Sequence, residues 1–317
     1  MQRMASGAQE LARWLDDASR KGLAALSESD TTAWRTMAAR MVDAQAPGLG
    51  QRLSQAMAVV GQGADWPATV LQRLGNLQLL VDAVTQPQQL TPALQSDMRQ
   101  ALGWPLERDD VLAQGERVSD VWQVLALVLQ EREPRLTERR VWLRGTGSQR
   151  LAVLMDYSYA GSPFEHGWSF DVPHHGTLAF YPGADPLRAL LAERAPAPSD
   201  GSAMTFVVAP AQAGPDQWTV LAQRMAANPW APSWPLHLDG VQLQYSADAR
   251  PQWWLCTDDQ RAIPLALTDA DGWQLMALGA GAAMPVFGEW NGEQLRPLSA
   301  WPADGRWSSA ALPGDAA

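Results

Sequence analysis

Hydrophobic residues with helical spacing dominate the first third of the chain. Apolar side chains recur at steps of three and four residues, which places them on one face of a helix. This pattern predicts five helices, over residues 7–26, 34–41, 47–60, 66–84 and 92–102. Thr91 followed by Pro92 is typical of a helix start, and Gly103 of a helix end. Because the connections are short, we expect a compact helical bundle or a solenoid-like domain.

A sixth helix is predicted where the chain leaves this region. Val118, Val121, Trp122, Leu125 and Val128 fall at three- and four-residue steps, and Pro134 ends the pattern because proline cannot continue a helix. The period then changes to two. An alternating segment around 141–144, a Gly145–Ser148 turn and an apolar run at 151–155 predict a β-hairpin. We therefore place the end of the helical domain at residue 133.

Short elements of mixed type follow the hairpin. We predict strands at 177–181 and 204–209, a short helix at 186–193 and a longer helix at 216–228. These form a mixed α/β region over residues 134–235. Five short strands are predicted after it, at 240–245, 253–257, 263–267, 273–277 and 284–290. Their spacing of about ten residues is typical of a small antiparallel β barrel or sandwich, here over 236–307. Residues 308–317 are expected to be a disordered tail. The predicted fold class is α+β.

Charge narrows the possible partners. The chain carries a formal charge of -10, and residues 151–317 contain all of the excess, with 7 basic and 17 acidic residues. Such a region repels nucleic-acid phosphates, so we do not expect this chain alone to bind nucleic acid. The N-terminus lacks a signal-peptide core, and no apolar run is long enough to cross a membrane. We expect a soluble, cytoplasmic protein.

Several segments resemble one known family. They are AARMVDAQAPGLGQRL (38–53), GERVSDVWQVLALVLQEREPRLTERRVWLRG (115–145), RLAVLMDYSYAG (150–161), GTLAFYPGADPLRAL (176–190) and VFGEWNGEQLRPLSAW (286–301). Together they resemble the region downstream of the finger in bacterial SWIM zinc-finger family proteins. The family takes its name from a CxCxnCxH zinc site, whereas this chain has a single cysteine, Cys256. The resemblance therefore implies no zinc here, and we expect no bound cofactor.

The resemblance implies that this chain acts as a partner domain of a nucleic-acid- or protein-binding zinc finger. Proteins of this family work beside a nucleic-acid- or protein-binding finger and are often encoded near MoxR-type ATPases and von Willebrand A-domain proteins. This chain is then either a separately encoded half, with a finger upstream of Met1 in another segment, or a relative that has lost its finger. A MoxR-type ATPase or an A-domain protein is the expected partner.

One cluster of side chains has the chemistry of a metal site. His166, Asp171, His174 and His175 lie within ten residues, and imidazole and carboxylate groups suit zinc or iron. Adjacent histidines on a strand point to opposite faces, so His174 and His175 would not share an ion. We interpret the cluster as loop histidines without a ligand.

Catalytic residues are harder to find. Cys256 lies in an apolar strand before two aspartates, which disfavour a thiolate, so we interpret it as a structural cysteine. The carboxylates of Asp156, Glu165, Asp171 and Asp185 show no spacing that selects a pair. We assign no catalytic residue.

Aromatic and basic residues are the remaining candidates for binding. Trp230 and Trp234 lie in a proline-containing loop, which makes them the tryptophans most expected at the surface as binding anchors, although packing in the core or under a lid is the favoured interpretation. Arg139 and Arg140 belong to a basic run that is interleaved with glutamates, a pattern typical of solvated salt bridges. The sequence thus favours a non-catalytic interaction or scaffold module. An enzyme with a dispersed active site and a nucleic-acid-associated module are the alternatives.

Overall fold

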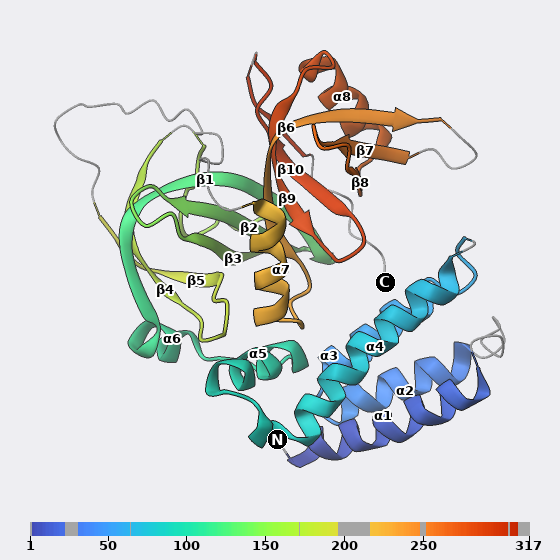
Figure 1. The fold of residues 1–317 in the computed structure, drawn as a ribbon. Coiled ribbons are helices and arrows are strands. Elements are labelled where there is room, and N and C mark those ends of the chain that lie inside the picture. The colour runs from blue at the N-terminus through green and yellow to red at the C-terminus, as the bar shows by residue number, and fades with distance from the viewer. Residues whose placement is uncertain are drawn as a thin grey trace. The chain divides into compact units, whose positions relative to one another are not determined.

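The structure is a computed structural model that describes residues 2–22, 31–63, 65–170, 172–195, 216–247, 252–303 and 305–309. The chain has an α+β fold and divides into two compact units (Figure 1). The helical unit comprises residues 1–107, 182–185 and 226–231. The β unit comprises residues 108–181, 186–225 and 232–317.

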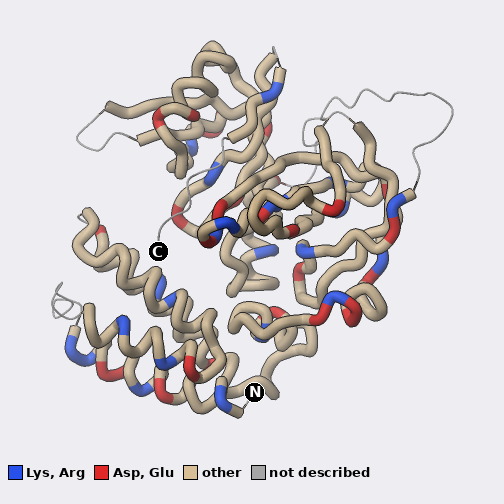
Figure 2. The backbone as a smooth tube through the Cα atoms, turned by 180° about the vertical axis from the view of Figure 1, so that it is seen from behind, with Lys and Arg blue, Asp and Glu red and all other residues tan. Residues whose placement is uncertain are grey.

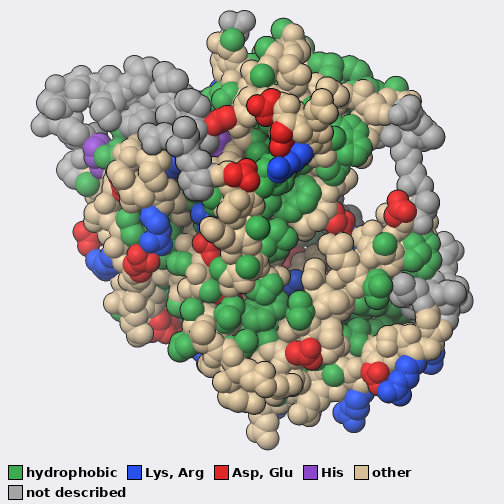
Figure 3. Space-filling model, in the orientation of Figure 1, with side chains coloured by type: hydrophobic (Ala, Val, Ile, Leu, Met, Phe, Trp, Pro, Cys, Tyr) green, Lys and Arg blue, Asp and Glu red, His purple; other side chains and the backbone are tan. Residues whose placement is uncertain are grey.

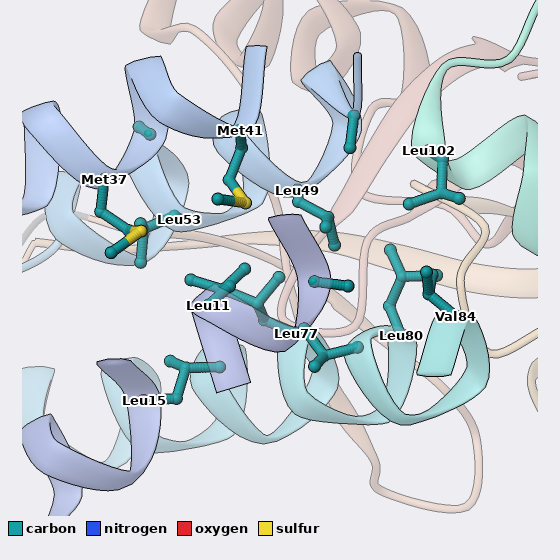
Figure 4. Close-up of a cluster of buried hydrophobic side chains, with 14 of the residues drawn as sticks. Leu11, Leu15, Met37, Met41, Leu49, Leu53, Leu77, Leu80, Val84 and Leu102 are labelled. Carbon is teal, nitrogen blue, oxygen red and sulfur yellow. The ribbon is translucent and has the colours of Figure 1, made fainter. Parts of the chain in front are cut away.

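The helical unit contains the five predicted helices. They are α1 (Gln2–Lys21), α2 (Thr31–Asp43), α3 (Pro47–Ala58), α4 (Trp66–Thr85) and α5 (Pro92–Leu102), with a short 3-10 turn at Pro87–Gln89. Figure 4 shows how leucines and methionines from these helices meet in one core, including Leu11, Met41, Leu53 and Leu77, none of which is exposed. The prediction of a compact helical bundle is confirmed. Residues 23–26 of the first predicted helix lie outside the described residues.

Local signals set the ends of α5. The Thr91 hydroxyl accepts a hydrogen bond from the Leu94 amide at 3.3 Å, and Gly103 has the left-handed φ of +86°. The start of α3 is set by close packing instead. A Cβ built on Gly48 would lie 1.9 Å from the Ala101 carbonyl oxygen, so only glycine lets α3 approach α5 this closely.

The sixth predicted helix is wrong, because residues Glu116–Glu133 form a long strand, β1. Trp122 and Val124 point into one core of the β unit, while Leu125 and Val128 belong to a second core on the opposite face. A strand buried on both faces has no polar alternation, and a bulge between Val124 and Ala126 further breaks the period of two. Its apolar residues therefore fall at the three- and four-residue steps that are typical of an amphipathic helix. The last helix before the strands, α6 (Arg108–Gln114), ends well before residue 133.

Five strands close into a barrel in the order β1-β2-β3-β5-β4. The others are β2 (Leu136–Gly145), β3 (Leu151–Tyr159), β4 (His174–Phe180) and β5 (Arg188–Arg194). The predicted hairpin corresponds to β2 and β3 and is confirmed. The predicted helix at 186–193 is wrong. Its residues form β5, which pairs antiparallel with the preceding strand β4 and parallel with β3, a strand that is distant from it in sequence.

The C-terminal strands form one six-stranded antiparallel sheet in the order β11-β10-β9-β6-β7-β8. They are β6 (Trp234–Ser246), β7 (Gln252–Cys256), β8 (Ala262–Pro264), β9 (Met284–Trp290), β10 (Leu295–Ala300) and β11 (Trp307–Ser308). The antiparallel pairing predicted for the C-terminal strands, as a small barrel or sandwich, is present in this sheet, and the closed barrel lies in the middle of the chain. Helix α7 (Gln217–Ala227) confirms the helix predicted at 216–228, whereas the strand predicted at 204–209 lies outside the described residues.

One predicted strand of this sheet is a helix, α8 (Asp269–Gly279). The Thr268 hydroxyl accepts a hydrogen bond from the Asp271 amide at 3.1 Å, and Ala280 ends the helix in a left-handed conformation. The Thr268 to Asp271 segment is therefore a helix cap, although its aspartates and glycine resemble a turn between strands.

A second core and one buried carboxylate join the barrel to the sheet within the β unit. Leu125, Trp142 and Val153 of the barrel pack with Phe287 and Leu298 of the sheet. Beside them both carboxylate oxygens of Glu289 accept hydrogen bonds from Arg140, at 2.9 and 3.0 Å, and one accepts from the Trp142 indole at 2.8 Å.

Candidate interaction surface

The histidine cluster does not converge on a point. Nε2 of His174 contacts the backbone of Ser169, and Nδ1 lies 2.9 Å from the Arg194 guanidinium. Burial, together with the charge of Arg194, lowers the pKa of His174 although the hydrogen bond with Ser169 opposes this. Both ring nitrogens are thus engaged. Asp171 lies outside the described residues, and the described part of the chain holds no group of three side chains placed to bind a metal.

Trp230 and Trp234 are buried, in agreement with core packing and not with exposure in a loop. They are 5% and 6% exposed, respectively. Trp230 belongs to the core of the helical unit, where Arg52 donates a hydrogen bond to its carbonyl oxygen. Trp234 is the first residue of β6 and pairs with Trp290 of β9. Loop composition indicated exposure, but long-range packing buries both rings, so neither is available as an anchor.

Arg139 and Arg140 are structural as well, not the solvated side chains that their interleaving with glutamates suggested. Arg139 is 6% exposed, donates to the Asp156 carboxylate and to the His166 carbonyl oxygen, and stacks over the Phe164 ring at 4.1 Å. Arg140 pairs with Glu289, as described above. Since β2 residues alternate between faces, these neighbouring arginines serve two different polar contacts of the β unit.

The other sequence candidates are dispersed. Cys256 is half-buried on β7. Asp156 is paired with Arg139, and Glu165 lies 3.6 Å from Arg108 in an exposed pair. Asp185 belongs to the helical unit, whereas Asp156 and Glu165 belong to the β unit.

One carboxyl group has a strongly shifted pKa, that of Asp97 on α5. Burial raises this pKa to about 6, the hydrogen bond from the Ala184 amide opposes the change, and the charge of Asp185 adds to it. The Ala184 amide donates at 2.8 Å, and a Cβ on Gly183 would lie 2.4 Å from the carboxylate. A shifted pKa can indicate a functional group, but these contacts all serve to hold the 182–185 segment on α5.

The surface with the most unusual composition is the outer face of α4. The twenty residues of α4 include two charged ones, Arg73 and Asp82. The inner face is the bundle core, with Val70, Leu77 and Val81 buried. The outer face exposes six uncharged residues at three- and four-residue steps before it reaches the exposed Asp82, namely Ala68, Leu71, Gln72, Gly75, Asn76 and Leu79. We call these six residues the α4 face.

Two leucines dominate the α4 face. Leu71 is 61% exposed and Leu79 is 54% exposed, eight residues apart on the same side of the helix. Large aliphatic side chains among uncharged residues are unusual on the solvent-facing side of a helix, so the α4 face has the composition of a covered surface. Leu71 is one of the apolar residues whose spacing predicts this helix, yet it lies on the exposed side. The signal for the correct interpretation was the near absence of charge across the whole helix.

Neighbouring helices of the unit have ordinary solvated faces. Basic and acidic residues are interleaved along α1 and α2, whereas α4 carries few of either (Figure 2). In the space-filling view, hydrophobic side chains reach the surface of the helical unit (Figure 3). Of the described helices, none is long and apolar enough to span a membrane.

Comparison with known proteins identifies part of the chain. Residues 1–102 match the family described as the SWIM-associated four-helix bundle domain. This match contains the resembling segment 38–53, and the other resembling segments lie beyond it. No curated protein and no solved structure matches the chain. The first 102 residues, which contain α1 to α5, are a SWIM-associated four-helix bundle domain.

Proposed function

We propose that this chain is a non-catalytic interaction module that binds a protein partner through the α4 face. The observation that carries the proposal is the pair Leu71 and Leu79, exposed among uncharged residues on the side of α4 that faces away from the bundle core. Covering each of these half-exposed side chains stabilises a complex by about 1 kcal/mol, before the cost of association.

The composition of the α4 face also selects the class of partner. From Ala68 to Leu79 its exposed positions carry no charge, so the face offers nothing to nucleic-acid phosphates. An apolar helix face fits a hydrophobic groove or a second helix on another protein. By the resemblance to SWIM zinc-finger proteins, we propose a MoxR-type ATPase or a von Willebrand A-domain protein as that partner.

A pull-down with matched variants tests the proposal. The tagged full chain is incubated with nuclease-treated lysate of its native cell, and bound proteins are quantified by mass spectrometry. We expect stoichiometric capture of an ATPase or A-domain protein, reduced at least about tenfold by the double substitution Leu71→Gln with Leu79→Gln. Val42→Gln is the control, because Val42 is 56% exposed on α2, outside the α4 face.

Two results would contradict the proposal. One is a bait that captures no protein, and the other is equal capture by the double variant and the parent chain. Circular dichroism and thermal unfolding of each variant check that the bundle is intact. Capture that occurs only in a parallel lysate without nuclease treatment would instead favour the nucleic-acid alternative.

A further inference from the structure

Three aromatic rings in the β unit pack against one another at the surface, away from the described binding candidates. They are Tyr245 of β6, Trp253 of β7 and Trp273 of α8. The ring centroids lie 4.6 Å apart for Tyr245 and Trp253, 5.0 Å for Tyr245 and Trp273, and 4.9 Å for the two tryptophans. Trp253 is 3% exposed, whereas Trp273 is 50% exposed. The cluster thus combines a buried ring, that of Trp253, with a half-exposed ring, that of Trp273.

The position of Trp273 is set by close packing of α8. The Trp253 indole donates a hydrogen bond to the Asp269 carboxylate at 2.9 Å, which ties the first turn of α8 to β7. A Cβ on Gly272 would lie 2.3 Å from the Trp253 ring, so the glycine permits α8 to rest directly on that ring. A ring that is already held in place loses little side-chain entropy when it binds a ligand.

Like α4, α8 exposes few charged residues. Leu275 and Gly279 are buried, and the exposed positions after Asp269 are Ala270, Trp273, Gln274, Ala277 and Leu278. We call these five residues the α8 face. Leu278 is 41% exposed, five residues beyond Trp273. A solvent-exposed ring beside an aliphatic side chain on one helix is the composition of an interaction surface.

Charge around the α8 face indicates what covers it. No lysine or arginine occurs in the sequence between Arg261 and Arg296, the stretch that contains α8. The first turn of α8 carries the exposed Asp269, whereas Asp271 is buried and accepts a hydrogen bond from the Thr268 hydroxyl. A cation is attracted both by the Asp269 carboxylate and by the face of an indole ring. A phosphate or an acidic peptide would be repelled.

We propose that the α8 face binds a basic segment of another protein, with an arginine or lysine side chain stacked on Trp273 and paired with Asp269. An aliphatic residue of the same segment covers Leu278. This surface shares no residue with the α4 face, so the proposal goes beyond the function proposed above and can fail independently of it.

Titration of the full chain with two synthetic peptides tests the proposal. One is an acetylated, amidated octapeptide of glycine, leucine and two arginines, and the other has citrulline in place of arginine, which keeps the shape but removes the charge. Binding is followed by calorimetry and by the indole N–H signals of the ¹⁵N-labelled chain. We expect the arginine peptide to bind at least about tenfold more tightly than the citrulline peptide, and more weakly as salt is raised.

Variants assign the binding to individual side chains. Trp273→Ala is expected to weaken binding of the arginine peptide by about tenfold. Asp269→Asn keeps an oxygen that can accept from Trp253 and is expected to weaken it severalfold while abolishing most of the salt dependence. Trp104→Ala is the control, because Trp104 is another partly exposed tryptophan, at 37%. Near-ultraviolet circular dichroism monitors the remaining aromatic cluster.

Three results would overturn the proposal. They are no binding of the arginine peptide at millimolar concentration, equal affinity for the citrulline peptide, and unchanged affinity in the folded Trp273→Ala and Asp269→Asn variants. The comparison of the two peptides uses the parent chain, so it decides the role of charge even if a variant does not fold.

Discussion

At the scale of single residues, burial decides which charged groups matter for stability. The carboxyl of Asp97 retains its proton to about pH 6 in the folded chain, whereas an ordinary aspartate loses it near 3.8. Below pH 3.8 the group is protonated in both states and has no effect on unfolding. As pH rises from 3.8 to about 6, the unfolded chain releases this proton first, so the free energy of unfolding falls.

The substitution Asp97→Asn should therefore stabilise the chain at neutral pH. Asparagine cannot ionise, and its oxygen can still accept the hydrogen bond from Ala184. We expect the variant to exceed the parent in unfolding free energy by roughly 1–3 kcal/mol at pH 7.5, with little difference at pH 4. Urea unfolding at both pH values measures this, and a variant less stable than the parent at pH 7.5 would refute the assignment.

His237 provides the opposite case on β6. Burial, and secondarily the charge of Arg144, lower its pKa to about 4. Above pH 6.5 the group is neutral in both states, and between pH 6.5 and 4 the unfolded chain gains a proton that the folded chain does not. His237 therefore destabilises the fold as pH falls through this window, while Asp97 destabilises it as pH rises from 3.8 to 6.

At the scale of elements, the surroundings of a helical glycine show whether that face of the helix is packed or free. Gly48 lies at the α3 and α5 contact, where a Cβ would meet a backbone oxygen, whereas nothing lies within 4 Å of a Cβ built on Gly75 of the α4 face. The two positions therefore differ in environment although both residues are helical glycines.

This contrast predicts stability changes of opposite sign. Gly48→Ala should destabilise the chain by about 2 kcal/mol or more, because the Ala101 backbone cannot move aside cheaply. Gly75→Ala should stabilise it by about 0.5–1 kcal/mol, since alanine is the better helix former and meets no obstacle. Thermal unfolding of both variants gives the comparison. Stabilisation by Gly48→Ala would mean that α3 and α5 are not in close contact.

At the scale of the whole molecule, the chain assembles two units from segments that alternate along the sequence. In the β unit, Glu289 of the sheet is the buried partner of Arg140 and Trp142 of the barrel, at 6% exposure. A carboxylate in this position stabilises the junction only while its partners are present, because each would otherwise be buried without a hydrogen bond.

Glu289→Ala should consequently cost about 3–5 kcal/mol, and Glu289→Gln less, since the amide retains one acceptor. Hydrogen exchange read by mass spectrometry should show faster exchange in β2 and β9, with α1 to α4 unchanged. Asp258→Ala, which removes an exposed carboxylate after β7, is the control. If Glu289→Ala exchanges no faster than this control, the ion pair does not join the barrel to the sheet.

What the sequence determined by itself was the α+β class, the five bundle helices and the β2–β3 hairpin. Each of these depends on neighbours within about twenty residues, such as the apolar spacing of α4 or the Thr91 cap and Gly103 stop of α5. Local interactions are sufficient to specify such elements, so they can be predicted from the order of residues along the chain.

Only the tertiary structure decided β1, β5 and α8, the burial of Trp230 and Arg139, and the exposure of Leu71 and Trp273. β1 is covered on both faces and β5 pairs with strands that come earlier in the sequence. Hydrophobicity shows that a side chain tends to be covered but not which partner covers it. The packing of distant segments chooses the buried faces, and the apolar faces that remain on α4 and α8 are the surfaces proposed for binding.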